Sequence, residues 1–327
     1  MSVVVPVFNA ESTLPRLAEG LERVLTAAPA FEVIFVNDGS RDASWSVVCA
    51  LANRFPWVTG INLMRNYGQH NALLCGIRRA RYDTIVTMDD DLQHPPEEVP
   101  KLLERIEAGY DVVYGTPETE QHGLWRDIAS KITKAALQGA MGAATARKAS
   151  AFRAFRSFLR DAFASYSGPF VSIDVLLTWA TTKYASVTVR HEPRQVGMSN
   201  YTFRKLMIHA LNMMTGFSTW PLQVASLLGF TFTVFGLLVL GWVIGRYLII
   251  GTSVPGFPFL ASIIAVFSGA QMFALGIMGE YLARMHFRSM ERPPYAVRET
   301  VESESNETSG PTQAAAQPMS SRRPANG

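Results

Sequence analysis

The chain has 327 residues, of which 48% are hydrophobic and 17% charged, and its formal net charge is +3. This length can bury the core of one large domain or two smaller ones. The net charge is small and no block of Lys and Arg is present, so the sequence lacks the features of a nucleic-acid-binding protein. Cys49 and Cys75 lack metal-ligand or redox spacing, so we expect two buried free thiols in a reducing compartment. No basic segment precedes the first apolar run, so we expect no cleavable signal.

The first half of the chain alternates short apolar runs with amphipathic helical stretches. The expected strands are residues 3–9, 31–40, 58–64, 83–91 and 111–115. Helices are expected between them, one carrying Leu14, Leu17 and Leu21, one carrying Val47 and Val48, and two starting at Gln69 and Pro95. Continuous apolar strands separated by helices predict an α/β fold, with a mostly parallel sheet covered by helices on both faces.

Polar residues stand where several of these strands end. They are Asn37-Asp38, Arg65-Asn66 and Asp89-Asp90-Asp91. In open parallel sheets, ligands bind at the carboxyl ends of the strands. The sequence therefore predicts a binding site at this edge.

The three consecutive aspartates need a specific explanation, because neighbouring carboxylates repel each other unless a cation or strong donors lie close by. Alternate residues of an extended segment point the same way, so Asp89 and Asp91 can project together. Two such oxygen ligands suit Mg²⁺ or Mn²⁺, which complete their coordination with phosphate and water. The alternative is helix capping before the prolines at 95 and 96, which accounts for one aspartate but not for three.

Beyond Pro221 the chain becomes strongly apolar, and the mean hydropathy of the whole chain is +0.10. Residues 224–244 and 257–278 are uncharged and long enough to cross a bilayer. Basic residues flank their outer ends, so the positive-inside rule places both termini and the catalytic domain in the cytoplasm. We therefore expect a multi-pass protein of the cell membrane. The alternative is a pair of buried core helices.

The expected domain boundaries follow from these changes in composition. Residues 1–199 form the α/β domain, 221–282 two transmembrane helices and 283–298 a cytoplasmic juxtamembrane segment. Residues 200–220 form an amphipathic helix, which either lies flat in the headgroup region or packs on the domain. Residues 299–327 are of low complexity and are expected to form a disordered tail.

Several motifs in this order resemble glycosyltransferase family 2, whose GT-A fold binds nucleotide sugars. They read "SVVVPVFNAESTL", "VNDGSRDAS", "LMRNYGQHNALLCGI" and "MDDDLQHPPEEVPKLLERIEAGYDVVYG". The later segments "LWRDIASKI", "SAFRAFR" and "RQVGMSNY", with the terminal apolar helices, resemble the polyprenyl-phosphate glycosyltransferases. The likeness runs from residue 3 to about residue 295, and several ordered motifs are far more specific than one pair of aspartates.

The resemblance implies a role for each matching residue on the donor side. Asp89 and Asp91 match the metal-binding aspartate pair, and Gln93 matches a polar residue beside it. The nucleotide-binding matches are Pro6, Phe8, Asn9, Glu11, Asp38, Arg65, Gly68, Asp89 and Asp90. The alternative is that these are turn and cap residues of a Rossmann-like domain.

On the acceptor side, the resemblance implies that a cluster of basic and hydroxyl residues holds a lipid phosphate. The matching residues are Arg126, Ser130, Lys131, Arg153, Arg194 and Ser199, with Tyr201 in the last motif. Guanidinium groups suit phosphate because their fork matches two oxygens, although any single arginine is also typical of a solvated surface. An acidic residue common before "FR" in relatives is missing here. Asp174 is a candidate substitute base, with a buried helix-cap role as the alternative.

The resulting prediction is an inverting, metal-dependent transferase, with Asp89, Asp91, Arg126 and Lys131 as catalytic residues. It would move a sugar from a nucleotide diphosphate, with UDP favoured and GDP as the alternative, to a polyprenyl phosphate at the cytoplasmic membrane face. Relatives that assemble through their membrane segments suggest a homo-oligomer. One alternative is a processive polysaccharide synthase, although no QxxRW motif is present. Another is a non-catalytic membrane partner that retains the sugar-nucleotide fold.

Overall fold

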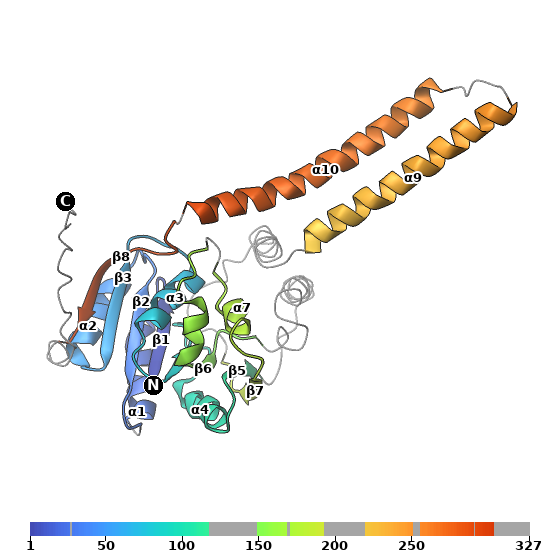
Figure 1. Ribbon diagram of the computed structural model, residues 1–327. Helices are drawn as coiled ribbons and strands as arrows, with labels where there is room; N and C mark the ends of the chain where they lie inside the picture. Colours follow the sequence, from blue (N-terminus) through green and yellow to red (C-terminus); the bar gives the residue numbers. More distant parts are fainter. Residues whose placement is uncertain are drawn as a thin grey trace, which may run out of the picture.

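The computed structural model describes residues 1–26, 28–117, 149–168, 171–192, 220–250, 256–290 and 292–303. Within these residues, eight strands form one sheet in the order β7-β5-β6-β4-β1-β2-β3-β8 (Figure 1). The strands are β1 (Ser2–Val7), β2 (Glu32–Asn37), β3 (Val58–Leu63), β4 (Thr84–Thr87), β5 (Val112–Pro117), β6 (Arg153–Arg156), β7 (Tyr184–Val189) and β8 (Val297–Glu302). The α-helices are α1 (Leu14–Leu25), α2 (Ser44–Arg54), α3 (Gln69–Arg79), α4 (Val99–Glu107), α7 (Ile173–Thr178), α9 (Trp220–Ile250) and α10 (Phe257–Ser289), and the 3₁₀ helices are η1 (Pro96–Glu98) and η2 (Ser157–Phe163).

The sheet is mixed but mostly parallel, as the sequence predicts. β4, β1, β2 and β3 run parallel to one another, and β5 runs parallel to β7. β6 is antiparallel to both β4 and β5, and β8 is antiparallel to β3. Every residue of β1, β2 and β3 is buried. Burial on both faces explains why the apolar residues of these strands follow one another rather than alternate with exposed polar ones.

Helices cover both faces of the sheet, which confirms the predicted layers. Leu17 of α1, Val48 of α2 and Leu102 of α4 belong to the core on one face. Leu73 of α3 and Leu176 of α7 belong to the core on the other face. The chain passes from β1 through β2 to β3, then crosses the opposite face in α3 and returns to pair β4 with the other side of β1. β1 and β4 thus form a topological switch point, where such sheets bind ligands.

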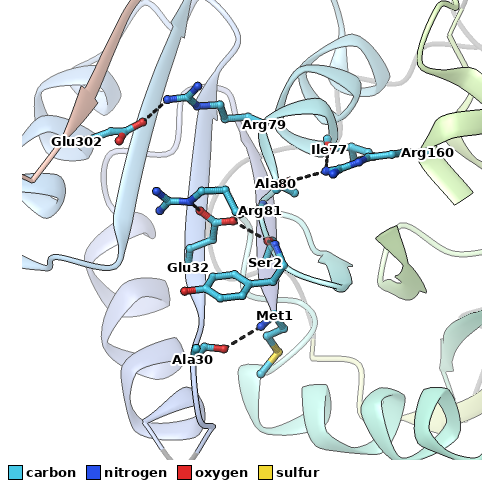
Figure 2. Close-up of polar contacts among 11 residues, drawn as sticks. Met1, Ser2, Ala30, Glu32, Ile77, Arg79, Ala80, Arg81, Arg160 and Glu302 are labelled. Carbon is cyan, nitrogen blue, oxygen red and sulfur yellow. Dashed lines mark hydrogen bonds and ion pairs between the residues drawn. The ribbon is translucent and has the colours of Figure 1, made fainter. Parts of the chain in front are cut away.

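The amino-terminal end of the sheet is held by an ion pair between the buried Glu32 and the half-exposed Arg81 (Figure 2). Glu32, which begins β2, is 3% exposed. Its Oε1 accepts hydrogen bonds from Ser2 Oγ (2.7 Å) and the Arg81 backbone N–H (2.7 Å), and its Oε2 accepts one from Arg81 Nε (2.8 Å). The Tyr82 backbone N–H donates to Ser2 Oγ (3.1 Å). These bonds join the starts of β1 and β2 to the turn before β4.

The last strand corrects the predicted domain boundaries. The sequence predicts a juxtamembrane segment up to residue 298 and disorder from residue 299, but residues 297–302 form β8 on the edge of β3. Val301 packs against the core, and Glu302 forms an ion pair with Arg79 (2.6 Å; Figure 2). The prediction was wrong here because the segment is acidic and its alternation of apolar and polar residues is short. Its partner strand, β3, also lies far back in the chain. The sheet therefore combines the first part of the chain with a strand that follows α10.

Two long helices, α9 and α10, lie side by side and project away from the sheet (Figure 1). The rings of Phe232 and Phe267 meet edge to face between them, with centroids 5.6 Å apart. Within the described residues, Pro221–Ile249 is the one stretch long and apolar enough to cross a membrane, and none of its most apolar window is buried. It contains the first predicted span, residues 224–244. The second predicted span lies within α10, and the predicted amphipathic helix lies outside the described residues except for Trp220, which begins α9.

Candidate active site

The site forms at the carboxyl ends of β1, β2, β3 and β4, where the sequence places its polar clusters. The backbone N–H of Phe8, just after β1, donates to Asp90 Oδ2 (3.0 Å), just after β4. This bond crosses the topological switch point and joins the first and fourth strand ends. Pro6 is buried within β1, whereas the Phe8 side chain is 47% exposed.

The loop after β1 is tied to the loop after β2 by short polar contacts. The Asn9 N–H donates to Ser40 Oγ (3.0 Å), and Asn9 Oδ1 accepts from the Arg41 N–H (2.8 Å). Asn9 adopts a positive φ of 55°, which asparagine tolerates better than most residues. Glu11 Oε2 accepts from the Ala43 N–H (2.8 Å). Asn9 and Glu11, both predicted to border a nucleotide, are therefore held in place by the second loop.

Asp38 is a buried carboxylate at the end of β2, only 3% exposed. Its Oδ1 accepts from the Tyr67 N–H (2.7 Å) and its Oδ2 from the Gly68 N–H (2.8 Å). Burial raises the pKa of Asp38 above its usual value, and the two backbone hydrogen bonds only partly oppose that effect. Asp38 thus joins the loops after β2 and β3.

Two glycines permit this junction. Gly39 has a φ of +66°, and a Cβ there would lie 2.5 Å from the Asn66 nitrogen. Gly68, which precedes α3, has a φ of +96°, a conformation that favours glycine. In the loop that precedes Gly68, the guanidinium of Arg65 lies over the Tyr67 ring, 4.5 Å from its centroid. The predicted residues Asp38, Arg65 and Gly68 are therefore neighbours in the structure.

The three aspartates occupy the turn that follows β4. Asp89 Oδ1 accepts from Gln69 Nε2 (2.6 Å), and Asp91 Oδ1 accepts from the Gln93 N–H (3.1 Å). Neither η1 nor α4 has a side-chain hydrogen bond at its N-cap, so capping does not account for the aspartates. Gln69 was missed by the sequence reasoning, although it stands in the quoted motif directly after Gly68.

The carboxylate oxygens of this turn suit a divalent cation whose remaining ligands come from the substrate. Within the described residues, no three His, Cys, Asp or Glu side chains are grouped to hold a metal ion by themselves. Mg²⁺ sites that use one or two carboxylates together with substrate phosphates need no such group. Asp89 and Asp91 each present carboxylate oxygens oriented by a hydrogen bond, which is the chemistry such a cation requires.

A buried arginine lies beneath the aspartate turn. Arg153, on β6, is 1% exposed, and its Nε donates to Thr87 Oγ1 (3.0 Å) at the end of β4. Its Nη1 pairs with Asp174, in the first turn of α7. Arg153 is predicted at the acceptor phosphate, and two of its guanidinium nitrogens, Nε and Nη1, already bond to Thr87 and Asp174. Asp174, the candidate substitute base, is 14% exposed in the same pair.

His94 packs behind the same turn and was not singled out from the sequence. Its ring stacks on Phe152, with centroids 5.1 Å apart, and meets His191 edge to face at 4.9 Å. Burial and the neighbouring His191 lower the pKa of His94 to about 4, and Asp91 partly opposes the shift. His94 is therefore neutral at pH 7 and acts as a packed aromatic support.

Most of the predicted acceptor residues lie outside the described residues. They are Arg126, Ser130, Lys131, Arg194, Ser199 and Tyr201. Among the predicted site residues, the structure therefore describes those expected to bind the nucleotide and the metal ion, together with Arg153.

The chain is similar to known proteins of one enzyme family. The model of the family described as Glycosyl transferase family 2 matches residues 2–166. An undecaprenyl-phosphate 4-deoxy-4-formamido-L-arabinose transferase of Pectobacterium carotovorum is 34% identical over 308 residues, covering 92% of this chain and 93% of that protein. A protein of the same name from Pseudomonas aeruginosa (strain PAO1) is 34% identical over 305 residues, covering 92% and 90%. Among solved structures, a glucosyl-3-phosphoglycerate synthase from Mycobacterium tuberculosis, in complex with Mn²⁺ and UDP-glucose, matches with a TM-score of 0.49 and 19% identity, covering 65% and 76%.

Proposed function

Because the chain belongs to glycosyl transferase family 2 and is a glycosyltransferase, we propose that it transfers a sugar from a UDP-sugar to undecaprenyl phosphate at the membrane surface. The observation that carries this proposal is the 34% identity to undecaprenyl-phosphate transferases over 92% of the chain. That coverage includes the apolar helices as well as the site-bearing sheet. A nucleotide-sugar site and membrane-bound helices on the same chain suit a sugar acceptor that is an insoluble lipid phosphate.

The donor would bind across the carboxyl ends of β1, β2 and β4. Asp38 would accept hydrogen bonds from the nucleotide base, since each of its oxygens keeps a second lone pair beyond its backbone bond. Pro6, Phe8, Asn9 and Glu11 would line the base and ribose, and Arg65 and Gly68 would lie beneath the nucleotide. Asp90, bonded to the Phe8 N–H, would hold these loops against the aspartate turn.

The diphosphate would lie beside Asp89 and Asp91, with Gln93 next to them. A Mg²⁺ or Mn²⁺ ion bound there supplies positive charge to the departing nucleotide diphosphate. Gln69, through its bond to Asp89, would fix the direction in which that carboxylate points. In this proposal, the hydrogen bonds of the turn orient the carboxylates that bind the metal ion.

The reaction would be an in-line displacement at the anomeric carbon. An oxygen of the lipid phosphate forms the new bond, the bond to the nucleotide diphosphate breaks, and the configuration inverts. A phosphate monoester has a second pKa near ~6, so the acceptor is already mostly dianionic at neutral pH and needs little help from a base. We assign the acceptor phosphate to Arg126, Lys131 and Arg194, assisted by Ser130 and Ser199. Arg153 would instead position Asp174 at the floor of the site.

The membrane arrangement completes the proposal. We propose that α10, like α9, spans the bilayer, and that basic residues near its end, including Arg288 and Arg292, keep that end on the cytoplasmic side. The catalytic sheet then lies at the cytoplasmic face, next to the headgroups of its acceptor. We also propose that the protein forms a homo-oligomer through these helices.

The test is transfer of label to lipid. Membranes containing the full chain are incubated with undecaprenyl phosphate, Mn²⁺ and one of a panel of radiolabelled UDP- and GDP-sugars, including the UDP donor of 4-deoxy-4-formamido-L-arabinose. We expect label in a small, chloroform-soluble lipid with one of these donors. Label in polymer would instead indicate a polysaccharide synthase. No transfer with any UDP- or GDP-sugar would indicate a non-catalytic protein, and either result overturns the proposal.

A further inference from the structure

A row of polar side chains crosses the carboxyl end of the sheet from β2 to β8. Asn37 of β2 is opposite Asn62 of β3, and Asn62 is opposite Glu299 of β8. Asn37 and Asn62 are 2% and 6% exposed. Asn37 Nδ2 donates to Asn62 Oδ1 (2.8 Å), and Asn62 Nδ2 donates to Glu299 Oε1 (2.8 Å). Two buried amides therefore end in a carboxylate on the strand that follows the apolar helices.

The carboxylate sets the direction of every bond in this row. A carboxylate only accepts hydrogen bonds, whereas an amide side chain has a donor end and an acceptor end. Asn62 must therefore turn its NH₂ group toward Glu299 and its oxygen toward Asn37. Asn37 must then donate with its NH₂ group, which leaves its Oδ1 on the side of the loop after β2.

That loop uses the oxygen of Asn37. The Ser40 N–H donates to Asn37 Oδ1 (3.4 Å), and Ser40 Oγ accepts from the Asn9 N–H (3.0 Å). The row thus continues from Glu299 to both loops that border the proposed donor site. If Asn37 were flipped, its NH₂ group would face the Ser40 N–H, and two donors would meet.

We propose that Glu299 is a positioning residue for the donor loops, acting through Asn62 and Asn37 on Ser40 and Asn9. The proposal rests on the donor site described under the proposed function. It adds that a strand located after the apolar helices sets the geometry in which the nucleotide is bound. Glu299 itself touches no donor atom in this scheme.

Three substitutions of Glu299 separate bond direction from general stability. Glu299→Gln keeps a carbonyl acceptor, Glu299→Ala removes it, and Glu299→Lys replaces it with a donor that favours the flipped amides. Glu302→Lys is the matched control, because it makes the same charge change on the same strand. Glu302 lies on the opposite face of the sheet, where it pairs with Arg79 of α3. Dissociation constants for UDP in the presence of Mn²⁺ are measured by calorimetry on the full chain in detergent micelles, and thermal midpoints on the same samples.

We expect Glu299→Ala to weaken UDP binding about three- to tenfold, the size typical of coupling within one hydrogen-bonded network. Glu299→Lys should weaken it further, while Glu299→Gln and Glu302→Lys should stay within about twofold of the unsubstituted protein. In transfer assays, the KM for the UDP-sugar should rise in the same order and the KM for the lipid should not change. Any other order, or an equal loss in Glu302→Lys, overturns the proposal. If Glu299→Lys does not fold, the difference between the Ala and Gln variants decides.

Asp38→Ala separates this inference from the function it rests on. Loss of UDP binding in Asp38→Ala, with unchanged binding in all Glu299 variants, overturns the positioning role alone. Retained UDP binding in Asp38→Ala overturns the donor site itself.

Discussion

Glu32 and Asp38 lie at opposite ends of β2, and both are 3% exposed. Glu32, at the amino end, has a cationic partner in Arg81 and a hydroxyl donor in Ser2 (Figure 2). Asp38, just past the carboxyl end, accepts two backbone N–H groups, and within the described residues no Lys, Arg or His forms an ion pair with it. One strand therefore carries two buried carboxylates that are stabilised in different ways.

The difference separates a structural end of the sheet from a functional one. A buried carboxylate with a counter-charge is satisfied within the protein and has little reason to meet a ligand. A buried carboxylate held by backbone N–H groups, as Asp38 is, keeps a raised pKa, and groups with shifted pKa values are common at functional sites. The aspartate turn after β4 lies at the same end of the sheet as Asp38, so acidic residues gather where we propose that the nucleotide and its cation bind.

The largest expected effect tests the carboxyl end directly. Asp91→Asn should lower sugar transfer at least about 100-fold, because it would replace a negatively charged ligand of the proposed cation with a neutral amide. Its thermal midpoint should stay close to that of the unsubstituted protein. Asp161→Asn, at an exposed acid in η2, is the matched control and should transfer normally. Near-normal transfer in Asp91→Asn would contradict the metal role.

A second change should sharpen the comparison by disturbing the junction at Asp38. Gly39→Ala places a Cβ 2.5 Å from the Asn66 nitrogen at a φ of +66°. We expect a loss of about 1–3 kcal/mol in the free energy of unfolding, together with about tenfold weaker UDP binding. Gly109→Ala controls for strain alone, because Gly109 has a φ of +98° but no atom within 4 Å of the added Cβ. Equal UDP binding in the two variants would argue against the role of this junction.

At the amino end, the expected effect is on stability alone. Glu32→Ala should lower the free energy of unfolding by about 1–3 kcal/mol, because Ser2 Oγ and the Arg81 N–H lose their acceptor. Arg81 is about half exposed and regains water, which limits the loss. Thermal unfolding and UDP titration of the same sample check this. Weaker UDP binding in a folded Glu32→Ala protein would mean that the two ends are not independent.

The smallest effect concerns pH. Burial raises the pKa of Asp38 in the folded protein, so the folded state binds this proton more tightly than the unfolded chain does. Stability from this group is therefore lost as pH rises through the folded pKa and regained on acidification. The thermal midpoint of the unsubstituted protein should rise relative to that of Asp38→Asn as pH falls from 7 toward 4. A constant gap, or one moving the other way, would contradict a raised pKa.

Much of the sheet could be predicted from the sequence because its central strands are continuous apolar runs that end in polar residues. Asn37-Asp38 and Asp89–Asp91 were expected at one edge of the sheet, and the bond between Phe8 and Asp90 joins two of those predicted ends. Local patterns fix where strands end, and the rules of parallel sheets then bring those ends together.

The parts that escaped prediction depend on partners distant in sequence. β8 was assigned to a disordered tail because its composition is acidic and its alternation is short. Asn62 and Glu299 are 237 residues apart, so no local pattern indicates their bond. The antiparallel insertion of β6 between β4 and β5 buries Arg153 in the interior, and its local motif does not indicate this burial.

The position of β8 also has a consequence for biosynthesis. A ribosome adding roughly 5–20 residues each second needs roughly 12–47 s to make the 237 residues from Asn62 to Glu299. Throughout that interval the β3 edge has no neighbour from β8, and an open strand edge is a site of unwanted pairing between nascent chains. The α/β domain can complete its sheet only after the apolar helices have been made, so synthesis of these helices precedes the last step of its folding.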